Sequence, residues 1–332
     1  MLNFMPVLVS LSLLGAGPSA ETVKSVETSA AKILDKVPGD SAFAFTEITK
    51  DGVQKLYGID ADQRFAIGSG FKLFILGELI EEVNDGRRRL SDTMLLSRDL
   101  KGPPSSEMAD WPVGSPATLN TLALKMISIS DNTATDHLHY LLGRENIEHQ
   151  MKVMGHSDPA VNIPLLCTRE MTQLRDKSTG LPAREYLKLD VAGRRKFLAT
   201  RLPMPSDYEK LDFDTAGYDL AEWYASPLDM AHALAWIYHH TGEDRPAHLL
   251  RQVLTIDPKL THDPAVWTFV GFKGGSEEQL LAGNWLLRHR TGRWFTLHSY
   301  FNNPKGALKP EQVVPVLDQI LKLIEPTLIS GK

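Results

Sequence analysis

The chain has 332 residues, of which 42% are hydrophobic and 23% are charged, as in a globular protein with a substantial core. Its formal net charge of −5 excludes the strongly basic surface of a nucleic-acid-binding protein. The single cysteine, Cys167, excludes an internal disulfide, and its neighbours lack the pattern of a catalytic thiol. Neither H-E-x-x-H nor a pair of C-x-x-C motifs occurs, so we expect no bound metal and no cofactor.

The chain begins with an apolar stretch that ends in small residues. Residues 1–15 are mostly apolar, and Pro18, Ser19 and Ala20 follow, as at the end of a secretory signal sequence. No lysine or arginine precedes this stretch, although signal sequences usually have one there. No segment reaches the ~20 apolar residues of a membrane span. We therefore predict a signal peptide over residues 1–20 and a periplasmic or secreted protein without a membrane span.

The segment after the signal peptide predicts one helix and two strands. Apolar residues recur at helical spacing from Val23 to Val37, and Pro38 ends the pattern. The sequence SAFAFTEI then alternates as a strand does. Asp51 and Gly52 turn the chain, so that VQKLYGI returns as a second strand.

Three helices are expected in the middle of the chain. The sequence GFKLFILGELIEEVNDG is long, apolar and free of proline, and it predicts a buried helix that opens at Ser69 and ends at Gly86. A second helix over residues 115–128 has Thr118 as its capping residue. A third helix ends at Gly143.

The rest of the chain changes from an irregular segment to strands. Residues 157–226 contain several prolines, with helical pieces expected around 168–175 and 183–199. A clearer helix starts at Pro227. The sequences AVWTFVGFKGGS, LAGNWLLRHR and RWFTLHSYFNN predict strands, the last two flanking a turn at residues 291–292, and an amphipathic helix closes the chain.

Helix and strands at both ends of the chain, with helices between them, predict an α/β protein of the α+β type. One sheet would be built from both ends of the chain and covered by helices. A helical lobe would be inserted between the two parts. The expected bounds are about 21–65 and 230–332 for the sheet part and about 66–229 for the lobe, within one domain of residues 21–332.

The sequence FAIGSGFKLF places a serine and a lysine in apolar surroundings. Ser69 and Lys72 are three residues apart, so they share one face of a helix. Burial among apolar residues favours the neutral amine of Lys72, which could accept the proton of the serine hydroxyl. The backbone N–H of Ser69 lies at the expected helix N-terminus, where donors favour a developing oxyanion. A second S-x-x-K, Ser29 to Lys32, lacks this context, and we expect Lys32 to face solvent.

Two further short segments complete a candidate constellation. The sequence Ser130-Asp131-Asn132 lies between two predicted helices, where it could supply a hydroxyl and an amide or could simply cap the second helix. The sequence KGGS, from Lys273 to Ser276, ends a predicted strand, and its glycines would allow a substrate to approach closely or would form an ordinary turn.

Together these segments resemble the S-x-x-K, S-D-N and K-T-G motifs of class A serine β-lactamases and the penicillin-binding protein superfamily. The resemblance covers residues 25–156 and 226–328 and is most specific at the first two motifs. It implies a mainly antiparallel sheet with helices on both faces, a helical lobe and an active site in the cleft. It also implies a monomer that acts on a small molecule.

The resemblance implies a role for each matching residue. Ser69 would be the acylated nucleophile, Lys72 its proton partner, and Ser130 the donor to the leaving nitrogen. Asn132, Lys273 and Gly275 would bind the substrate, and the backbone N–H groups of Ser69 and Ser276 would form the oxyanion hole.

The chain departs from the family pattern at two places. Residue 274 is glycine where the third motif has threonine, which removes one contact to a substrate carboxylate. The E-x-x-L-N sequence, whose glutamate activates the deacylating water in class A enzymes, does not occur between residues 157 and 226. Four glutamates of that segment remain candidates for this role, and so does Lys72; the glutamates are Glu170, Glu185, Glu209 and Glu222.

Three functions remain open from the sequence. The first is an exported serine hydrolase that opens β-lactam-like cyclic amides. The second is an esterase or a cell-wall D,D-peptidase that also forms an acyl-enzyme. The third is a binding protein on the same fold that acylates slowly or not at all.

Overall fold

The computed structural model describes residues 17–102, 106–202, 212, 214 and 220–328. Most of the predicted signal peptide, residues 1–16, lies outside the described residues. No helix in the described ranges has the length and hydropathy needed to cross a membrane.

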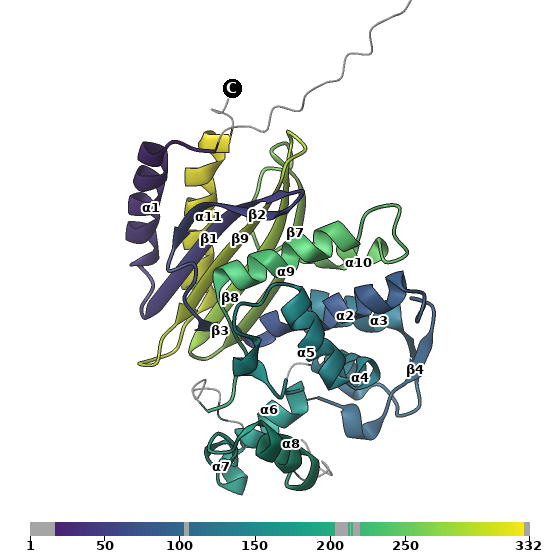
Figure 1. Cartoon of the computed structure of the whole chain (residues 1–332). Coiled ribbons are helices and arrows are strands. Elements are labelled where there is room, and N and C mark those ends of the chain that lie inside the picture. Colours follow the sequence, from purple (N-terminus) through teal and green to yellow (C-terminus); the bar gives the residue numbers. More distant parts are fainter. Residues whose placement is uncertain (1–16, 103–105, 203–211, 213, 215–219, 329–332) are drawn as a thin grey trace, which may run out of the picture.

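A five-stranded antiparallel sheet joins the two ends of the chain (Figure 1). Its strand order is β2-β1-β9-β8-β7. The bounds are β1 Asp40–Thr49, β2 Gly52–Ile59, β7 Trp267–Glu277, β8 Leu280–His289 and β9 Trp294–Asn302. The central pairing of β1 with β9, for example Phe43 with Ser299, joins segments that are far apart in the sequence, so the expected sheet from both ends is confirmed.

Helices cover both faces of this sheet. The terminal helices α1 (Ala20–Leu34) and α11 (Pro310–Ile324) pack on one face, and α9 (Pro227–His240) packs on the other (Figure 1). Alternation along β1 explains this, because Phe43 belongs to the core under the terminal helices and Ala42 to the core shared with the lobe. The predicted fold class is therefore confirmed.

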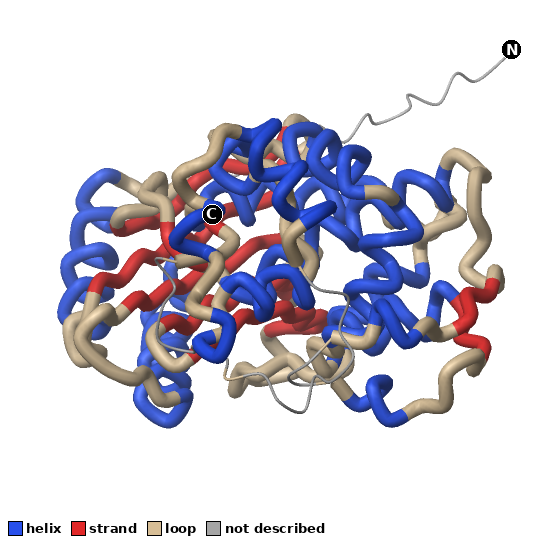
Figure 2. Tube along the Cα trace, turned by 90° about the horizontal axis from the view of Figure 1, so that it is seen from below, coloured by secondary structure: helices blue, strands red, loops and turns tan. Residues whose placement is uncertain are grey.

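The helical lobe lies beside the sheet (Figures 1 and 2). Its helices and those that follow in the chain have these bounds: α2 Lys72–Asn84, α3 Leu119–Ser128, α4 Asn132–Leu142, α5 Arg144–Val153, α6 Thr168–Leu174, α7 Ala183–Tyr186, α8 Val191–Thr200 and α10 Leu249–Gln252. Two short sheets complete the fold: β3 Phe65–Ala66 with β6 Tyr224–Ala225, and β4 Thr93–Leu95 with β5 Pro116–Thr118.

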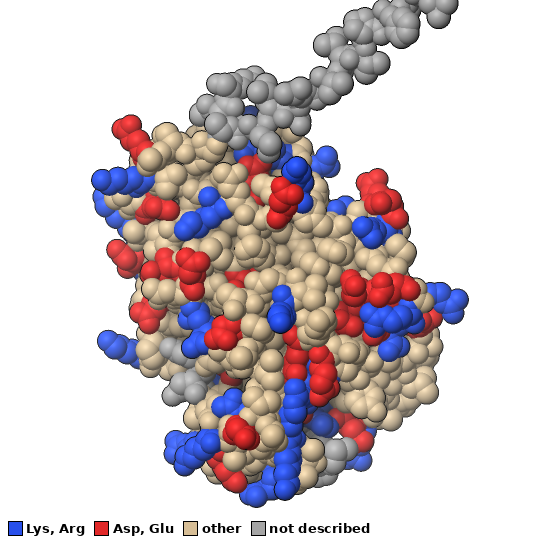
Figure 3. All heavy atoms as spheres, viewed as in Figure 1, with Lys and Arg blue, Asp and Glu red and all other residues tan. Residues whose placement is uncertain are grey.

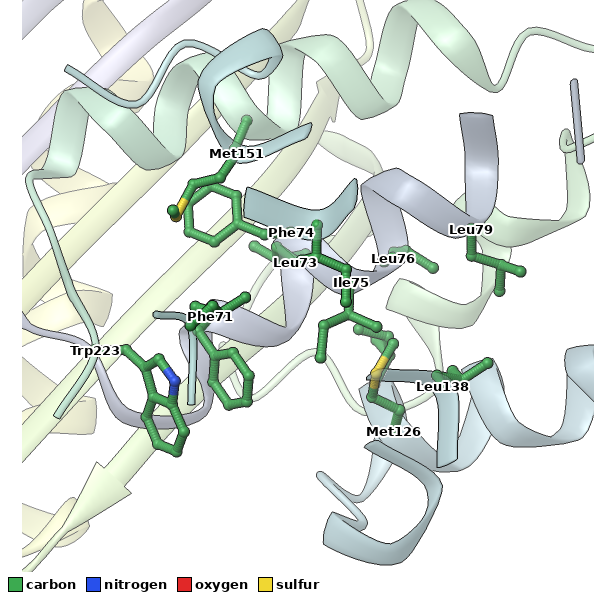
Figure 4. Close-up of a cluster of buried hydrophobic side chains, with 14 of the residues drawn as sticks. Phe71, Leu73, Phe74, Ile75, Leu76, Leu79, Met126, Leu138, Met151 and Trp223 are labelled. Atoms are coloured by element: carbon green, nitrogen blue, oxygen red, sulfur yellow. The ribbon is translucent and has the colours of Figure 1, made fainter. Parts of the chain in front are cut away.

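Helix α2 is the centre of the lobe. Its face toward α4 and α5 and its face toward α9 are both buried, and Figure 4 shows its apolar side chains packed against those of neighbouring elements. The expected start at Ser69 is wrong, because a 3-10 turn over Gly68–Phe71 comes first and α2 begins at Lys72. Gly68 has a positive φ of 47°, which bends the chain toward β7 before the α-helix starts.

Other local predictions have mixed outcomes. Thr118 caps α3 through a bond from the Thr121 N–H, and Gly143 ends α4 with a φ of 84°, as expected. The single helical piece expected over 183–199 is instead two helices, α7 and α8.

Figure 3 shows basic and acidic side chains interspersed on one face of the molecule, and neither sign of charge dominates that face.

Candidate active site

Ser69 lies in the 3-10 turn where the lobe meets strand β7. The two backbones approach so closely that a Cβ atom at Gly275 would lie 2.0 Å from the Ile67 carbonyl oxygen and 2.6 Å from the Ser69 nitrogen. Only glycine allows this contact. Gly275 therefore brings the Ser69 backbone beside the end of β7, where Ser276 follows.

A cleft of about 730 Å³ opens at this junction. Six of the seven residues predicted for the site line it: Ser69, Ser130, Asn132, Lys273, Gly275 and Ser276. The seventh, Lys72, is completely buried and forms hydrogen bonds with two of the lining residues, Ser130 and Asn132. The structure thus brings all seven together from three segments of the chain. Within the described ranges, no His, Cys, Asp and Glu side chains form a group of three or more that could hold a metal.

The amine of Lys72 is held by the S-D-N segment. Its Nζ donates to the Ser130 carbonyl at 2.7 Å, to Ser130 Oγ at 3.1 Å and to Asn132 Oδ1 at 2.7 Å. Burial lowers the pKa of Lys72 to about 7, although the nearby carboxylates of Asp131 and Asp136 partly oppose this. The amine is therefore divided between its charged and neutral forms near neutral pH.

A second buried lysine reaches Ser130 from the opposite wall. Nζ of Lys273 donates to Ser130 Oγ at 3.1 Å and to the Gly274 carbonyl at 2.5 Å. Burial, and then the charge of Lys72, hold the pKa of Lys273 well below its ordinary value. Ser130 itself has a positive φ of 60°, an uncommon conformation that places its hydroxyl between the two amines. The Ser130 hydroxyl is consequently in contact with two potential proton donors.

Two buried aspartates hold the walls of the cleft, and the sequence reasoning missed the role of one of them, Asp136. Asp131 caps α4 through the Ala134 N–H at 2.9 Å. Asp136 accepts from the Thr168 N–H at 2.8 Å, the Thr168 hydroxyl at 2.7 Å and the Arg169 N–H at 2.9 Å. Burial raises the pKa of Asp136 to about 6. Asp136 lies among other polar residues of NTATDHLHYLL, so its local sequence gave no signal of this role.

Comparison with known proteins identifies the family of this chain. A model of the β-lactamase enzyme family matches residues 25–254. The chain belongs to the β-lactamase enzyme family. No curated protein matches the sequence.

Solved structures with the β-lactamase fold are similar to nearly the whole chain. A β-lactamase from Sphaerobacter thermophilus is 19% identical, has a TM-score of 0.62 and covers 94% of this chain and 99% of its own. The extended-spectrum β-lactamase TLA-3 is 13% identical, with a TM-score of 0.66 and coverage of 93% and 100%. A PBP-A variant in an acyl-enzyme complex with penicillin G is 15% identical, with a TM-score of 0.63 and coverage of 92% and 97%.

This β-lactamase family member differs from the class A pattern in the loop that follows α5. Two of the four glutamates considered from the sequence are engaged elsewhere. Glu170 forms an ion pair with Arg144, Oε1 to Nη2 at 2.6 Å, and caps the Cys167 N–H. Glu185 lies 3.4 Å from Arg201 Nη2 on the exposed outer part of the lobe.

Of the other two glutamates, the structure describes only Glu222. Glu222 is buried beside Arg175 and is not among the residues that line the cleft. Glu209 lies outside the described residues. The glutamate that does line the cleft among the described residues is Glu277, at the end of β7, which sequence reasoning did not consider. The loop residue that Asp136 holds against the cleft is Thr168, whose side chain carries no carboxylate.

Two aromatic rings support the turn that carries Ser69. The rings of Phe71 and Trp223 stack with centroids 3.9 Å apart and planes inclined by 4° (Figure 4). The indole N–H of Trp223 donates to the Leu166 carbonyl at 2.9 Å. Trp223 also lines the cleft. Its ring therefore connects the loop at Leu166 with the 3-10 turn that carries Ser69.

Proposed function

We propose that this β-lactamase family member is an exported serine hydrolase that forms an acyl-enzyme at Ser69 and hydrolyses β-lactam-like cyclic amides. The observation that carries the proposal is the convergence of two lysine amines with lowered pKa values on Ser130, in a cleft that Ser69 also lines. Export rests on the predicted signal peptide over residues 1–20.

Acylation begins with loss of the Ser69 hydroxyl proton to the neutral amine of Lys72. The Ser69 oxygen then forms a bond to the substrate carbonyl carbon, and the backbone N–H groups of Ser69 and Ser276 stabilise the oxyanion. As the carbon–nitrogen bond breaks, the Ser130 hydroxyl gives its proton to the leaving nitrogen. The ammonium of Lys72, 3.1 Å from Ser130 Oγ, restores that proton. The step leaves an ester at Ser69 and no net change in protonation.

Substrate binding is assigned to the two walls of the cleft. Asn132 would hold the substrate amide, while Lys273 and Gly275 would meet its carboxylate side. Lys273 already contacts Ser130, so an anionic substrate group there would also favour the charged form of its amine. Residue 274 supplies no hydroxyl to that carboxylate, and we expect weaker binding of β-lactam carboxylates than a threonine would allow.

Acylation should depend on pH through Lys72. Because the neutral amine is the proton acceptor, the acylation rate constant is expected to rise about tenfold per pH unit below pH 7 and to level off above it. The measurement is stopped-flow acylation by a chromogenic cephalosporin from pH 5 to 9. A flat profile across this range would show that Lys72 is not the acceptor.

Deacylation is expected to be the slow step, because the loop has no E-x-x-L-N sequence and none of the three loop glutamates that the structure describes lines the cleft. Mass spectrometry after mixing with penicillin, a cephalosporin and a simple ester tests this. A penicillin adduct that persists for minutes supports the proposal, and rapid return to the free mass would mean that Lys72 or another group activates water.

The same experiment separates the alternative functions. An esterase or cell-wall D,D-peptidase would turn over the ester or a D-alanyl peptide while β-lactam adducts persist, and the absence of the E-x-x-L-N sequence favours this second candidate. A binding protein that acylates slowly or not at all would give no adduct on the time scale of the experiment.

A further inference from the structure

One arginine and two glutamates form a buried cluster at the cleft wall that the proposed mechanism does not use. Arg175 follows α6, Glu222 precedes β6 and Glu277 ends β7. Nη1 of Arg175 lies 2.7 Å from Glu277 Oε2 and 3.4 Å from Glu222 Oε2. The side chains of Arg175 and Glu222 are 0% exposed and that of Glu277 is 11% exposed. Glu277 lines the cleft two residues after Gly275.

The charges of this cluster do not balance if both glutamates are ionised. One guanidinium faces two carboxyl groups, and burying an uncompensated carboxylate is costly. Burial and the mutual repulsion with Glu277 raise the pKa of Glu222 well above its ordinary value, and burial also raises the pKa of Glu277. A proton retained on one of the two glutamates relieves this imbalance. Because Glu222 and Glu277 interact so closely, that proton is shared by the pair and is not assigned to one residue.

Three neighbouring charged groups on the packed elements have other partners. Asp176, next to Arg175, accepts from the N–H and hydroxyl of Ser178. Glu170 on α6 is paired with Arg144, and the amine of Lys273 on β7 binds Ser130 and Gly274. Arg175 also donates from Nε to the backbone carbonyl of Asp214 at 2.9 Å. Among the described residues, the charges that act on the pair are those of Arg175 and of the two glutamates themselves.

We propose that Arg175, Glu222 and Glu277 form a one-proton lock that holds the loop after α6 against the end of β7, and that this cleft wall loosens when the shared proton is lost. With both carboxylates charged, repulsion drives Glu277 toward the cleft, because it is the member with an exposed edge.

The lock is connected to the active-site turn through a chain of contacts. Glu222 accepts the backbone N–H of Trp223 at 2.8 Å, and the ring of Trp223 stacks on Phe71. Glu277 follows Ser276, whose N–H is the proposed oxyanion donor. The three residues therefore act by positioning the wall and do not need to touch the reacting atoms.

The first test measures thermal unfolding of the parent and Glu222→Gln from pH 5 to 9. A carboxyl whose folded-state pKa is raised stabilises the fold fully below its ordinary pKa of about 4.3, and this contribution is lost as pH rises through the folded-state pKa. Glutamine keeps the shape and hydrogen bonding of the protonated group but cannot ionise. The difference in Tm between variant and parent should shift in favour of the variant by about 2 °C or more when the pH is raised from 6 to 9.

Glu170→Gln is a matched control, for which the expected pH dependence of the stability difference has the opposite sign. The charge of Arg144, acting against burial, holds the pKa of Glu170 below its ordinary value, so its contribution is present at neutral pH and is lost as pH falls. This variant should therefore be less stable than the parent at pH 8 and approach it near pH 4.

The second test asks whether the wall itself moves. Hydrogen exchange of peptides covering residues 168–180 is compared between parent and Glu222→Gln at pH 6.5 and 8.5, with peptides of α9 as the internal reference. Exchange in the parent should become faster than in the variant as the pH rises, by about tenfold, the factor that corresponds to one pKa unit. If Glu222→Gln does not fold, Glu277→Gln carries the same expectation, since it also removes one of the two charges.

Identical pH dependence of Tm and exchange in parent and variant overturns the lock. If neither variant folds, the parent alone decides the question. Loop exchange that does not accelerate relative to α9 between pH 6.5 and 8.5 then refutes the proposal, and selective acceleration supports it. Neither measurement uses a substrate, so either result leaves the proposed acyl-enzyme chemistry to be judged separately.

Discussion

Replacing Ser69 with alanine is expected to abolish acyl-enzyme formation while leaving the fold intact. No other serine of the cleft combines a buried lysine three residues later with a position at the junction of the 3-10 turn and β7. Removal of a catalytic nucleophile costs at least about 10⁴-fold in rate. Mass spectrometry after incubation with penicillin measures the adduct, and thermal unfolding checks the fold.

Ser130→Ala is the useful companion variant. It keeps the proposed nucleophile but removes the hydroxyl that contacts both lysine amines. We expect a slower reaction that still places the adduct on Ser69, which peptide mapping would show. An adduct of normal yield on the Ser69→Ala protein would move the nucleophile elsewhere, with Ser130 as the next candidate.

Lys72→Ala is expected to lower the acylation rate by at least about 10²-fold, the scale of a positioned proton acceptor. The amine is fully buried, its pKa is lowered to about 7, and its three hydrogen bonds end on Ser130 and Asn132. The variant also removes donors from those oxygens, so its Tm should fall as well. The acylation rate is therefore measured at a temperature where the variant is folded.

The chain supplies its own control in the second S-x-x-K segment. Lys32 is exposed in the last turn of α1, a helix that contributes no residue to the lining of the cleft. Lys32→Ala should leave acylation unchanged. Equal losses in the two lysine variants would show that burial and position do not distinguish Lys72, and the proposed mechanism would then fail.

Much of the architecture could be predicted from local patterns. Helical spacing of apolar residues located α1 and α11, and a long apolar run without proline located α2. Alternation located β1, and residues typical of strands located β7–β9. The motifs around Ser69 and Ser130 were recognisable because residue types at fixed spacing share a helix face or a cap. The start of α2 was misplaced, since Gly68 meets β7, an element about 200 residues further along the chain.

The contacts that make a site belong to the tertiary structure. Ser130 meets Lys72 across 58 residues and Lys273 across 143, and no local rule relates such positions. The same holds for Glu170 and Glu222, which looked equivalent in the sequence. In the structure Glu170 pairs with Arg144. Glu222 shares Arg175 with Glu277. The sequence by itself therefore determined the elements and the chemical groups that they carry. Only the tertiary structure decided which groups are buried together, because desolvation and pairing depend on distances through space.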